Sequence, residues 1–245
     1  MKKILVVALT LIFSISAYAG ANIEVDAGFP LGIKNRTNVK YSWSNVKGER
    51  MDLGLSDGYS EDSSGIGLEY RGNFFFVSPN KYIDFGFEAG FGLFQWEKTV
   101  FSDDLPGEKN GFDSWSNYYV LLGPVLRINF NRLCSVSFSA GFKPLAGSIT
   151  FDGSKSSGYY DDCFMAGVDA YFSASSKLWL VSKTTFHFGL NAGINVFTPL
   201  TGYYSFDQAK AYTGAWDCEY NIDSGYGANL YLGVCFNFGR LSLDR

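Results

Sequence analysis

The chain of 245 residues is rich in aromatic residues and glycine, with 23 Phe, 16 Tyr, 5 Trp and 28 Gly, against only 6 Pro and 1 His. Its formal net charge of −4 argues against a nucleic-acid partner, and none is expected. About 225 residues of mature chain can bury a large core as one domain.

The N-terminus, MKKILVVALTLIFSISAYAG, has the three parts of a secretory signal. Lys2 and Lys3 precede an apolar run over residues 4–15, and Ala17 and Ala19 supply the small residues of a cleavage site. We therefore expect residues 1–19 to be a signal peptide; loss of its two lysines takes the net charge from −4 to −6. The apolar run is too short for a transmembrane anchor, and no longer one follows it.

Eight later segments alternate between apolar and polar or glycine residues with a period of two, as strands with two different faces do. In DFGFEAGFGLF, residues 84–94, every second residue from Phe85 to Leu93 is apolar. The predicted strands are 22–33, 64–77, 82–98, 115–130, 133–149, 159–174, 184–198 and 224–238. Ordinary strands have about 5–6 residues, whereas a tilted strand that crosses a bilayer needs about 9–11.

The expected connections are of two kinds. Residues 78–81 and 131–132 form short turns, and 175–183 forms a somewhat longer link, whereas 34–63, 99–114, 150–158 and 199–223 form long loops. Short turns on one side and long loops on the other are typical of outer-membrane barrels. Residues 20–238 are therefore predicted to form an all-β, eight-stranded antiparallel transmembrane barrel with both termini periplasmic, the aromatic face meeting lipid. A soluble sandwich is the alternative, and it explains neither the strand lengths nor the loops.

One segment fits this scheme poorly. The apolar residues of KLWLV, residues 178–182, do not share the parity of the strand predicted over 184–198. The segment is interpreted as a bulged start of that strand, with Trp179 at the membrane interface.

The last predicted strand ends in YLGVCFNF, residues 231–238, with Gly233, Phe236 and Phe238 at the spacing of an insertion signal. The chain resembles the OmpW/OmpX-like group of small eight-stranded outer-membrane proteins and is also similar to spirochaetal barrels of this size. The resemblance implies an outer-membrane location, contact with its lipid, and recognition of the last strand by the barrel-assembly machinery. Residues 239–245 depart from it, because that signal usually ends the protein; they are expected to be a short periplasmic tail.

Charges of both signs fall on the lumen parity toward the turns. The lumen of an eight-stranded barrel is just filled by side chains, so these charges should pair and plug it. They are Glu24, Asp26, Glu69, Arg71, Asp84, Glu88, Arg127, Asp169 and His187.

Toward the loops the lumen parity is largely glycine, interspersed with larger, mostly apolar residues. We expect a pocket there, open to the outside and closed below, that binds or passes a small apolar solute, as the resemblance to OmpW also implies. Its expected residues are Gly92, Phe94, Tyr119, Leu121, Leu145, Met165 and Gly193. The alternative is that the glycines only let the strands curve while the loops fill the space.

No catalytic, metal or cofactor site is expected. His187 is the single histidine, and a general base also needs a nucleophile and an orienting partner. It also lies at the wrong end for the lipid-modifying enzymes found among such barrels. The acidic pairs at 103–104 and 161–162 lack metal-ligand spacing.

Two further expectations concern the loop side. Cys163 and Cys218 are a candidate disulfide in a compartment that permits oxidation, with two free thiols as the alternative. Aromatic residues crowd the predicted loop 199–223, so a surface adhesin or structural barrel that contacts host or matrix ligands is the alternative function.

Overall fold

The computed structural model describes residues 22–45, 50–51, 58–61, 64–102, 111–151, 162–207 and 216–241, so the predicted signal peptide lies outside it. The strands are β1 (Asn22–Asn45), β2 (Arg50–Met51), β3 (Gly58–Glu61), β4 (Ser64–Asn80), β5 (Ile83–Ser102), β6 (Gly111–Asn131), β7 (Cys134–Phe151), β8 (Asp162–Lys183), β9 (Phe186–Asp207) and β10 (Trp216–Phe238). A search of the same residues finds no helix with the length and apolarity to span a membrane.

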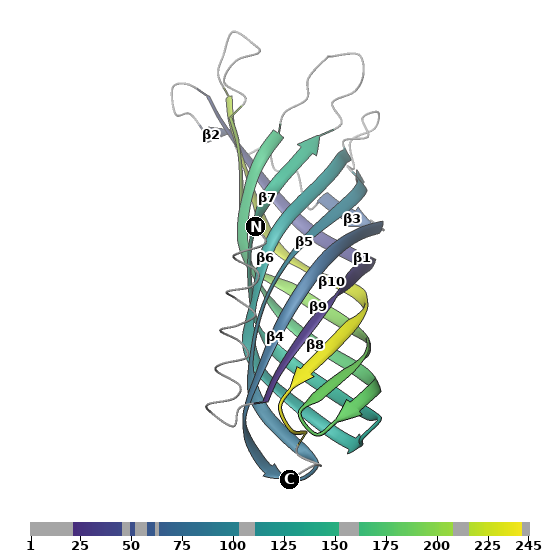
Figure 1. Ribbon diagram of the computed structural model, residues 1–245. Helices are drawn as coiled ribbons and strands as arrows, with labels where there is room; N and C mark the ends of the chain where they lie inside the picture. Colours follow the sequence, from purple (N-terminus) through teal and green to yellow (C-terminus); the bar gives the residue numbers. More distant parts are fainter. Residues whose placement is uncertain are drawn as a thin grey trace, which may run out of the picture.

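Eight long strands close into one antiparallel barrel (Figure 1). Each of β4 to β9 pairs with its successor, and β1 joins the two ends by pairing with both β4 and β10. The short strand β3 lies between β1 and β5 beyond the end of β4, and β2 pairs with the far end of β1. The predicted eight-stranded barrel is confirmed.

Three two-residue turns connect strands at one end of the barrel, at residues 81–82, 132–133 and 184–185. The interpretation of residues 175–183 was wrong. This segment is the end of β8, and its Lys177 pairs with Ser135 and Asn191 on the neighbouring strands. A register shift between Trp179 and Val181 is the physical reason that the parity changes there.

The strands also run further toward the loop end than expected. β1 continues to Asn45 and β5 to Ser102, and the eight long strands have 17–24 residues. Beyond the bilayer both faces of a strand meet water, so the apolar–polar contrast that marks a membrane-spanning strand disappears while the backbone pairing continues. The predicted strands were therefore too short on this side.

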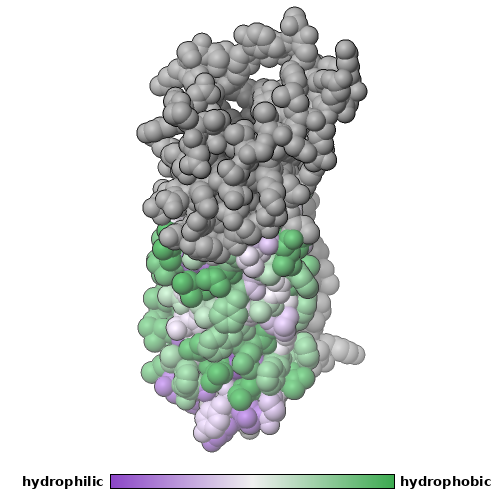
Figure 2. Space-filling view, turned by 180° about the vertical axis from the view of Figure 1, so that it is seen from behind, coloured by the Kyte–Doolittle hydropathy of each residue, from purple (hydrophilic) through white to green (hydrophobic). Residues whose placement is uncertain are grey.

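The two faces of the barrel wall differ sharply. Phe85, Phe87 and Phe91 are 44%, 44% and 59% exposed, whereas Asp84 and Glu88 on the alternate positions are 0% and 2% exposed. Figure 2 shows hydrophobic residues over most of the described surface on one side of the barrel and hydrophilic residues at the turn end. So large an apolar surface marks the part of the barrel that faces lipid, as the alternation predicts.

Candidate functional site in the barrel lumen

The lumen is lined by inward-facing residues of all eight long strands, and most of the buried ones are polar. Their ion pairs, hydrogen bonds and ring contacts form three layers, which we call lower, middle and upper in order from the turn end. The lower layer contains Glu24, Asp26, Asn73, Asp84, Arg127 and Lys177; the middle layer contains Glu69, Arg71, Glu88, Tyr119 and Tyr171; the upper layer contains Lys143, Asp169 and Phe197.

In one half of the lower layer, Lys177 of β8 reaches across the lumen to two carboxylates of β1. Its ammonium pairs with Glu24 and lies 3.1 Å from Asp26 Oδ2. Asn73 Nδ2 on β4 donates to the same two carboxylates, at 2.9 Å and 3.3 Å. These groups bind β1, β4 and β8 together through the centre of the barrel.

In the other half, Arg127 of β6 holds two carboxylates. Its Nη1 lies 3.0 Å from Glu24 Oε2, and its Nη2 lies 2.8 Å from Asp84 Oδ2. The guanidinium carbon stands 4.0 Å from the centre of the Phe75 ring, a cation–π contact. Arg127 and Glu24 are both fully buried, so this pair is shielded from solvent screening.

The middle layer is centred on Arg71 of β4. Its Nη2 lies 2.5 Å from Glu69 Oε1 and its Nη1 lies 3.6 Å from Glu88 Oε2. The second oxygen of Glu69 accepts a 2.5 Å hydrogen bond from the Tyr119 hydroxyl, and Glu88 Oε1 accepts one of 2.8 Å from the Tyr171 hydroxyl. Both carboxylates therefore have charged and neutral donors, as buried charges require.

The upper layer changes in character. Lys143 Nζ on β7 lies 3.4 Å from Asp169 Oδ2 on β8. The same ammonium stands 4.6 Å from the centre of the Tyr119 ring and 4.0 Å from that of Phe197. Two aromatic rings therefore flank this ammonium. In the layers below, Arg127 and Arg71 each face one ring, of Phe75 and Tyr231, and amide and hydroxyl oxygens accept further hydrogen bonds from them.

The structure therefore brings eight of the nine predicted plug residues into these layers. His187 lies apart: its Nδ1 is 2.9 Å from Ser182 Oγ across the turn, and its ring lies edge-on to Trp179, 5.8 Å between centroids. Sequence reasoning missed Lys177 and Lys143 as members. Lys143 was visible on the lumen parity of its strand, whereas Lys177 fell in the misassigned link.

Trp179 is also inside the lumen and not at the interface. It is 1% exposed, donates from Nε1 to Ser135 Oγ at 3.2 Å, and forms an apolar cluster with Cys235 and Leu241. Leu241 belongs to the tail that the sequence placed in the periplasm, and it is 0% exposed. Leu241 thus packs inside the turn-side mouth of the barrel.

The tail reaches this position through a backbone turn. Gly239 has φ 120°, a conformation that a side chain would disfavour, and its N–H donates to Thr185 O at 3.0 Å. Asn22 Nδ2 donates to Arg240 O at 2.8 Å. Residues 239–241 are therefore anchored to both β1 and the β8–β9 turn.

The predicted pocket residues fall into three groups. Phe94, Tyr119 and Leu121 are 2%, 4% and 3% exposed and packed. Leu145 is partly exposed and stands in register between Tyr119 and Gly167. The side chain of Met165 lies outside the described residues.

The two glycines of the predicted pocket differ. A Cβ on Gly92 would meet the ring of Tyr119, so that ring already takes up the volume next to the glycine. A Cβ on Gly193 would lie 2.5 Å from the backbone oxygen of Ala174, so bulk there collides with the neighbouring strand. Substitution of Gly193 is therefore a poor test of a pocket.

On the outer face, Phe236 and Phe238 of the predicted insertion signal pack beside β9. Their rings lie 5.1 Å from Phe188 and 5.7 Å from Phe186. Gly233 lies opposite Gly28 on β1. Cys163 is on β8 and Cys218 on β10, with β9 between them, and their side chains lie outside the described residues. Their disulfide stays a prediction.

Comparison with known proteins bears on the fold. No protein-family model and no curated protein matches the chain. The solved structure of the outer-membrane protein OprG from Pseudomonas aeruginosa is similar with a TM-score of 0.50 at 12% identity, over 89% of this chain and 96% of that one.

Two more solved structures are less similar. The outer-membrane protease OmpT from Escherichia coli has a TM-score of 0.45 at 11% identity, over 89% of this chain and 96% of its own. Ail, the attachment invasion locus protein of Yersinia pestis, has 0.31 at 13%, over 85% and 98%. With its closed ring of eight strands and lipid-facing surface, the chain is an outer-membrane β-barrel by fold.

Proposed function

We propose that this protein is a non-enzymatic outer-membrane barrel that takes up a small apolar solute at the loop-side end of its lumen. The observation that carries the proposal is the change of lining along the axis. In the lower and middle layers Arg71, Arg127 and Lys177 each hold two carboxylates. The Lys143–Asp169 pair above them is a single ion pair, and its ammonium faces the rings of Tyr119 and Phe197.

The position of Leu145 supports an accessible site above this floor. It faces the lumen next to Lys143, and it and Gly167 beside it are both partly exposed, whereas Phe94 and Tyr119 are packed. An apolar solute placed there meets aromatic and aliphatic surface and leaves the ion pairs undisturbed. Lys143 and Asp169 are already paired with each other, so neither charge of the upper layer is left for a charged solute.

The seam between β6 and β7 supports passage of the solute toward the bilayer. Pro124 and Pro144 each lack a backbone donor. Pairing is interrupted beside them, and the nearest paired positions are Tyr119–Leu145, Leu122–Phe142 and Val125–Ser139. A weakened seam next to a closed lower lumen favours lateral exit over passage through the barrel.

The test places bulk at Leu145. The full chain, refolded into phospholipid vesicles, is titrated with a fluorescent naphthylamine dye, and protein-free vesicles give the baseline. Leu145→Trp should weaken dye binding several-fold. Phe142→Trp, on the same strand but 60% exposed to lipid, should bind like the unmodified protein. Equal binding by both folded variants contradicts the pocket.

Two partners belong to the same proposal. The outward rings of Phe236 and Phe238 at the end of β10 can be recognised by the barrel-assembly machinery. The rest of the apolar belt contacts membrane lipid. Host or matrix ligands of the loops stay a prediction, because most of the predicted loop side lies outside the described side chains.

A further inference from the structure

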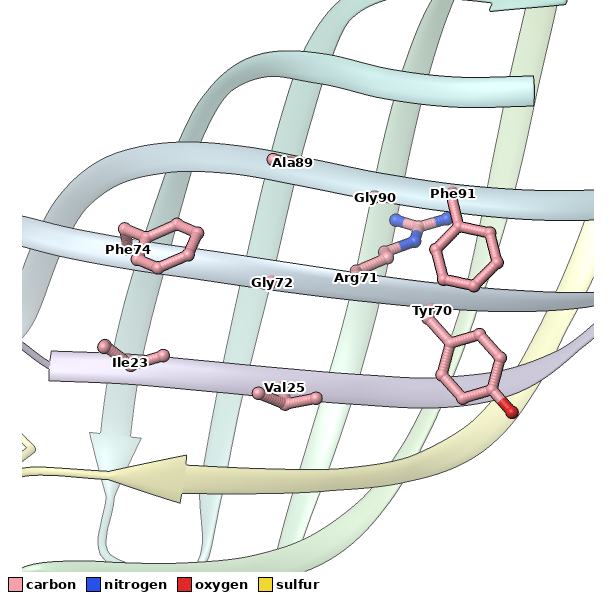
Figure 3. A pocket seen from close by; sticks show the side chains of 9 residues that line it. All are labelled: Ile23, Val25, Tyr70, Arg71, Gly72, Phe74, Ala89, Gly90 and Phe91. Atoms are coloured by element: carbon pink, nitrogen blue, oxygen red, sulfur yellow. The ribbon is translucent and has the colours of Figure 1, made fainter. Parts of the chain in front are cut away.

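The outer wall of the barrel carries a hollow that the lumen does not share. It has a volume of about 330 Å³ and lies over β1, β4 and β5 (Figure 3). Its lining residues are Ile23, Val25, Tyr70, Arg71, Gly72, Phe74, Ala89, Gly90 and Phe91. That volume is at the lower end of the roughly 300–1,000 Å³ of small-molecule sites.

The strand register explains the hollow. Val25, Gly72 and Ala89 lie opposite one another on the three strands and form a row of small side chains. The next outward-facing row toward the loops includes Tyr70 and Phe91, whose rings stack at 5.3 Å. Phe74 stands in the row on the other side of Gly72. A furrow with aromatic walls therefore crosses β1, β4 and β5.

The open floor of the furrow depends on Gly72. A Cβ built at this position has its nearest neighbours at 3.4 Å, the Phe74 ring, and 3.5 Å, Ala89 O. These are ordinary contacts, and the backbone of Gly72 is not in the left-handed region. The fold thus tolerates a side chain at this position, and the hollow exists because none is present.

We propose that a segment of one phospholipid acyl chain occupies this hollow. Apart from Arg71, whose guanidinium is paired with Glu69 and Glu88 in the lumen, the lining side chains are apolar. A water molecule in the hollow therefore has few polar partners, and an empty hollow loses dispersion contacts. The furrow is continuous with exposed apolar surface, since Tyr70, Phe74 and Phe91 are 39%, 40% and 59% exposed, and lipid chains surround such a surface in the membrane. Val25 lies near the start of β1 and Phe74 near the end of β4, both toward the turn end, which places the furrow in the leaflet on the turn side.

The experiment adds a side chain at Gly72, on the floor of the furrow. Unmodified protein, Gly72→Ala and Gly72→Leu are refolded into nanodiscs of phosphatidylethanolamine and phosphatidylglycerol and released for native mass spectrometry. Ala192→Leu adds three carbons, against four in Gly72→Leu, at an exposed outward position on β9, which does not line the furrow, and is the control. Heat-dependent gel mobility checks that each variant is folded.

The unmodified protein and Ala192→Leu should retain one phospholipid after release. That adduct should decrease in Gly72→Ala and fall several-fold in Gly72→Leu.

Equal retention by all four proteins overturns the proposal. So does a dimer of the unmodified protein that Gly72→Leu abolishes, because a second copy then covers the furrow. Parallel nanodiscs with added lipopolysaccharide test the source: an adduct of lipopolysaccharide in place of phospholipid overturns the assignment to phospholipid. Gly72→Ala keeps the test valid if Gly72→Leu fails to fold.

Discussion

The turn-side and loop-side ends of the lumen are filled in two different ways by one alternating sequence pattern. In the lower layer, Lys177 and Arg127 each hold two carboxylates, and amides supply further donors. Around the upper layer, the volume next to Gly92 is taken by the Tyr119 ring, and Phe197 covers Lys143. The two-residue period of each strand decides which residues face inward. The types of those residues decide whether the interior is an ionic network or an aromatic packing.

The difference matters for how each end responds to change. A buried ion pair that loses one partner leaves an unpaired charge in a low-dielectric interior, which costs about 3–5 kcal/mol. An aromatic packing that loses part of a ring loses contact area, and neighbouring side chains partly collapse into the space. We therefore expect the turn-side end to be the rigid closure, and the proposed solute site lies at the loop-side end.

The largest effect is expected at Arg127. Arg127→Met keeps much of the side-chain length but leaves Glu24 and Asp84 without their guanidinium partner. We expect a loss of about 3–5 kcal/mol in the free energy of unfolding, measured by urea titration of the refolded barrel. Lys81→Met removes a positive charge at an exposed turn and is the control. If the two variants lose equal stability, the lower layer is not the rigid closure.

A second prediction concerns Leu241, which packs inside the turn-side mouth of the barrel. Leu241→Ala should open access to Cys235, which is 0% exposed behind it, while leaving the ion pairs intact. The measurement is the labelling rate of Cys235 by a charged thiol reagent, in a background in which Cys134, Cys163 and Cys218 are serine. We expect a rate increase of about tenfold or more, because labelling follows the population of the open form.

Leu241→Met conserves the bulk of the side chain and should label as slowly as the unmodified tail. Fast labelling of the protein before any change at Leu241 contradicts a closed mouth.

The sequence was sufficient for the fold because the bilayer imposes a contrast on every spanning strand. Residues 84–93 show it without exception, and their inward and outward faces are those of the structure. The contrast fails where the bilayer ends, so the extension of β1 to Asn45 was missed. It also fails at a register shift, and the shift after Trp179 concealed both Lys177 and the lumen position of Trp179.

The candidate site was less predictable for a different reason. Parity assigns a residue to the lumen but not to a partner, so Glu69, Arg71 and Tyr119 were all placed inside without their contacts. Glycine on the lumen parity was interpreted as free volume, yet at Gly92 an aromatic ring from the next strand already takes up that space. The tail gave no signal at all, because a single leucine after a barrel strand has no periodic pattern.

The smallest effect is expected at the residue that belongs to both ends of the lumen. The hydroxyl of Tyr119 donates to Glu69 in the middle layer, while its ring lies against Gly92 and faces Lys143. Tyr119→Phe removes only the hydroxyl, and a hydrogen bond to a charged group contributes about 1.5–3 kcal/mol. We therefore expect a stability loss below that of Arg127→Met and unchanged binding of the naphthylamine dye, because the ring that lines the upper lumen remains.

Urea unfolding and dye titration on one sample measure both quantities. If Tyr119→Phe weakens dye binding while stability is unchanged, the solute contacts the hydroxyl, and the division between an ionic lower lumen and an apolar upper one is wrong.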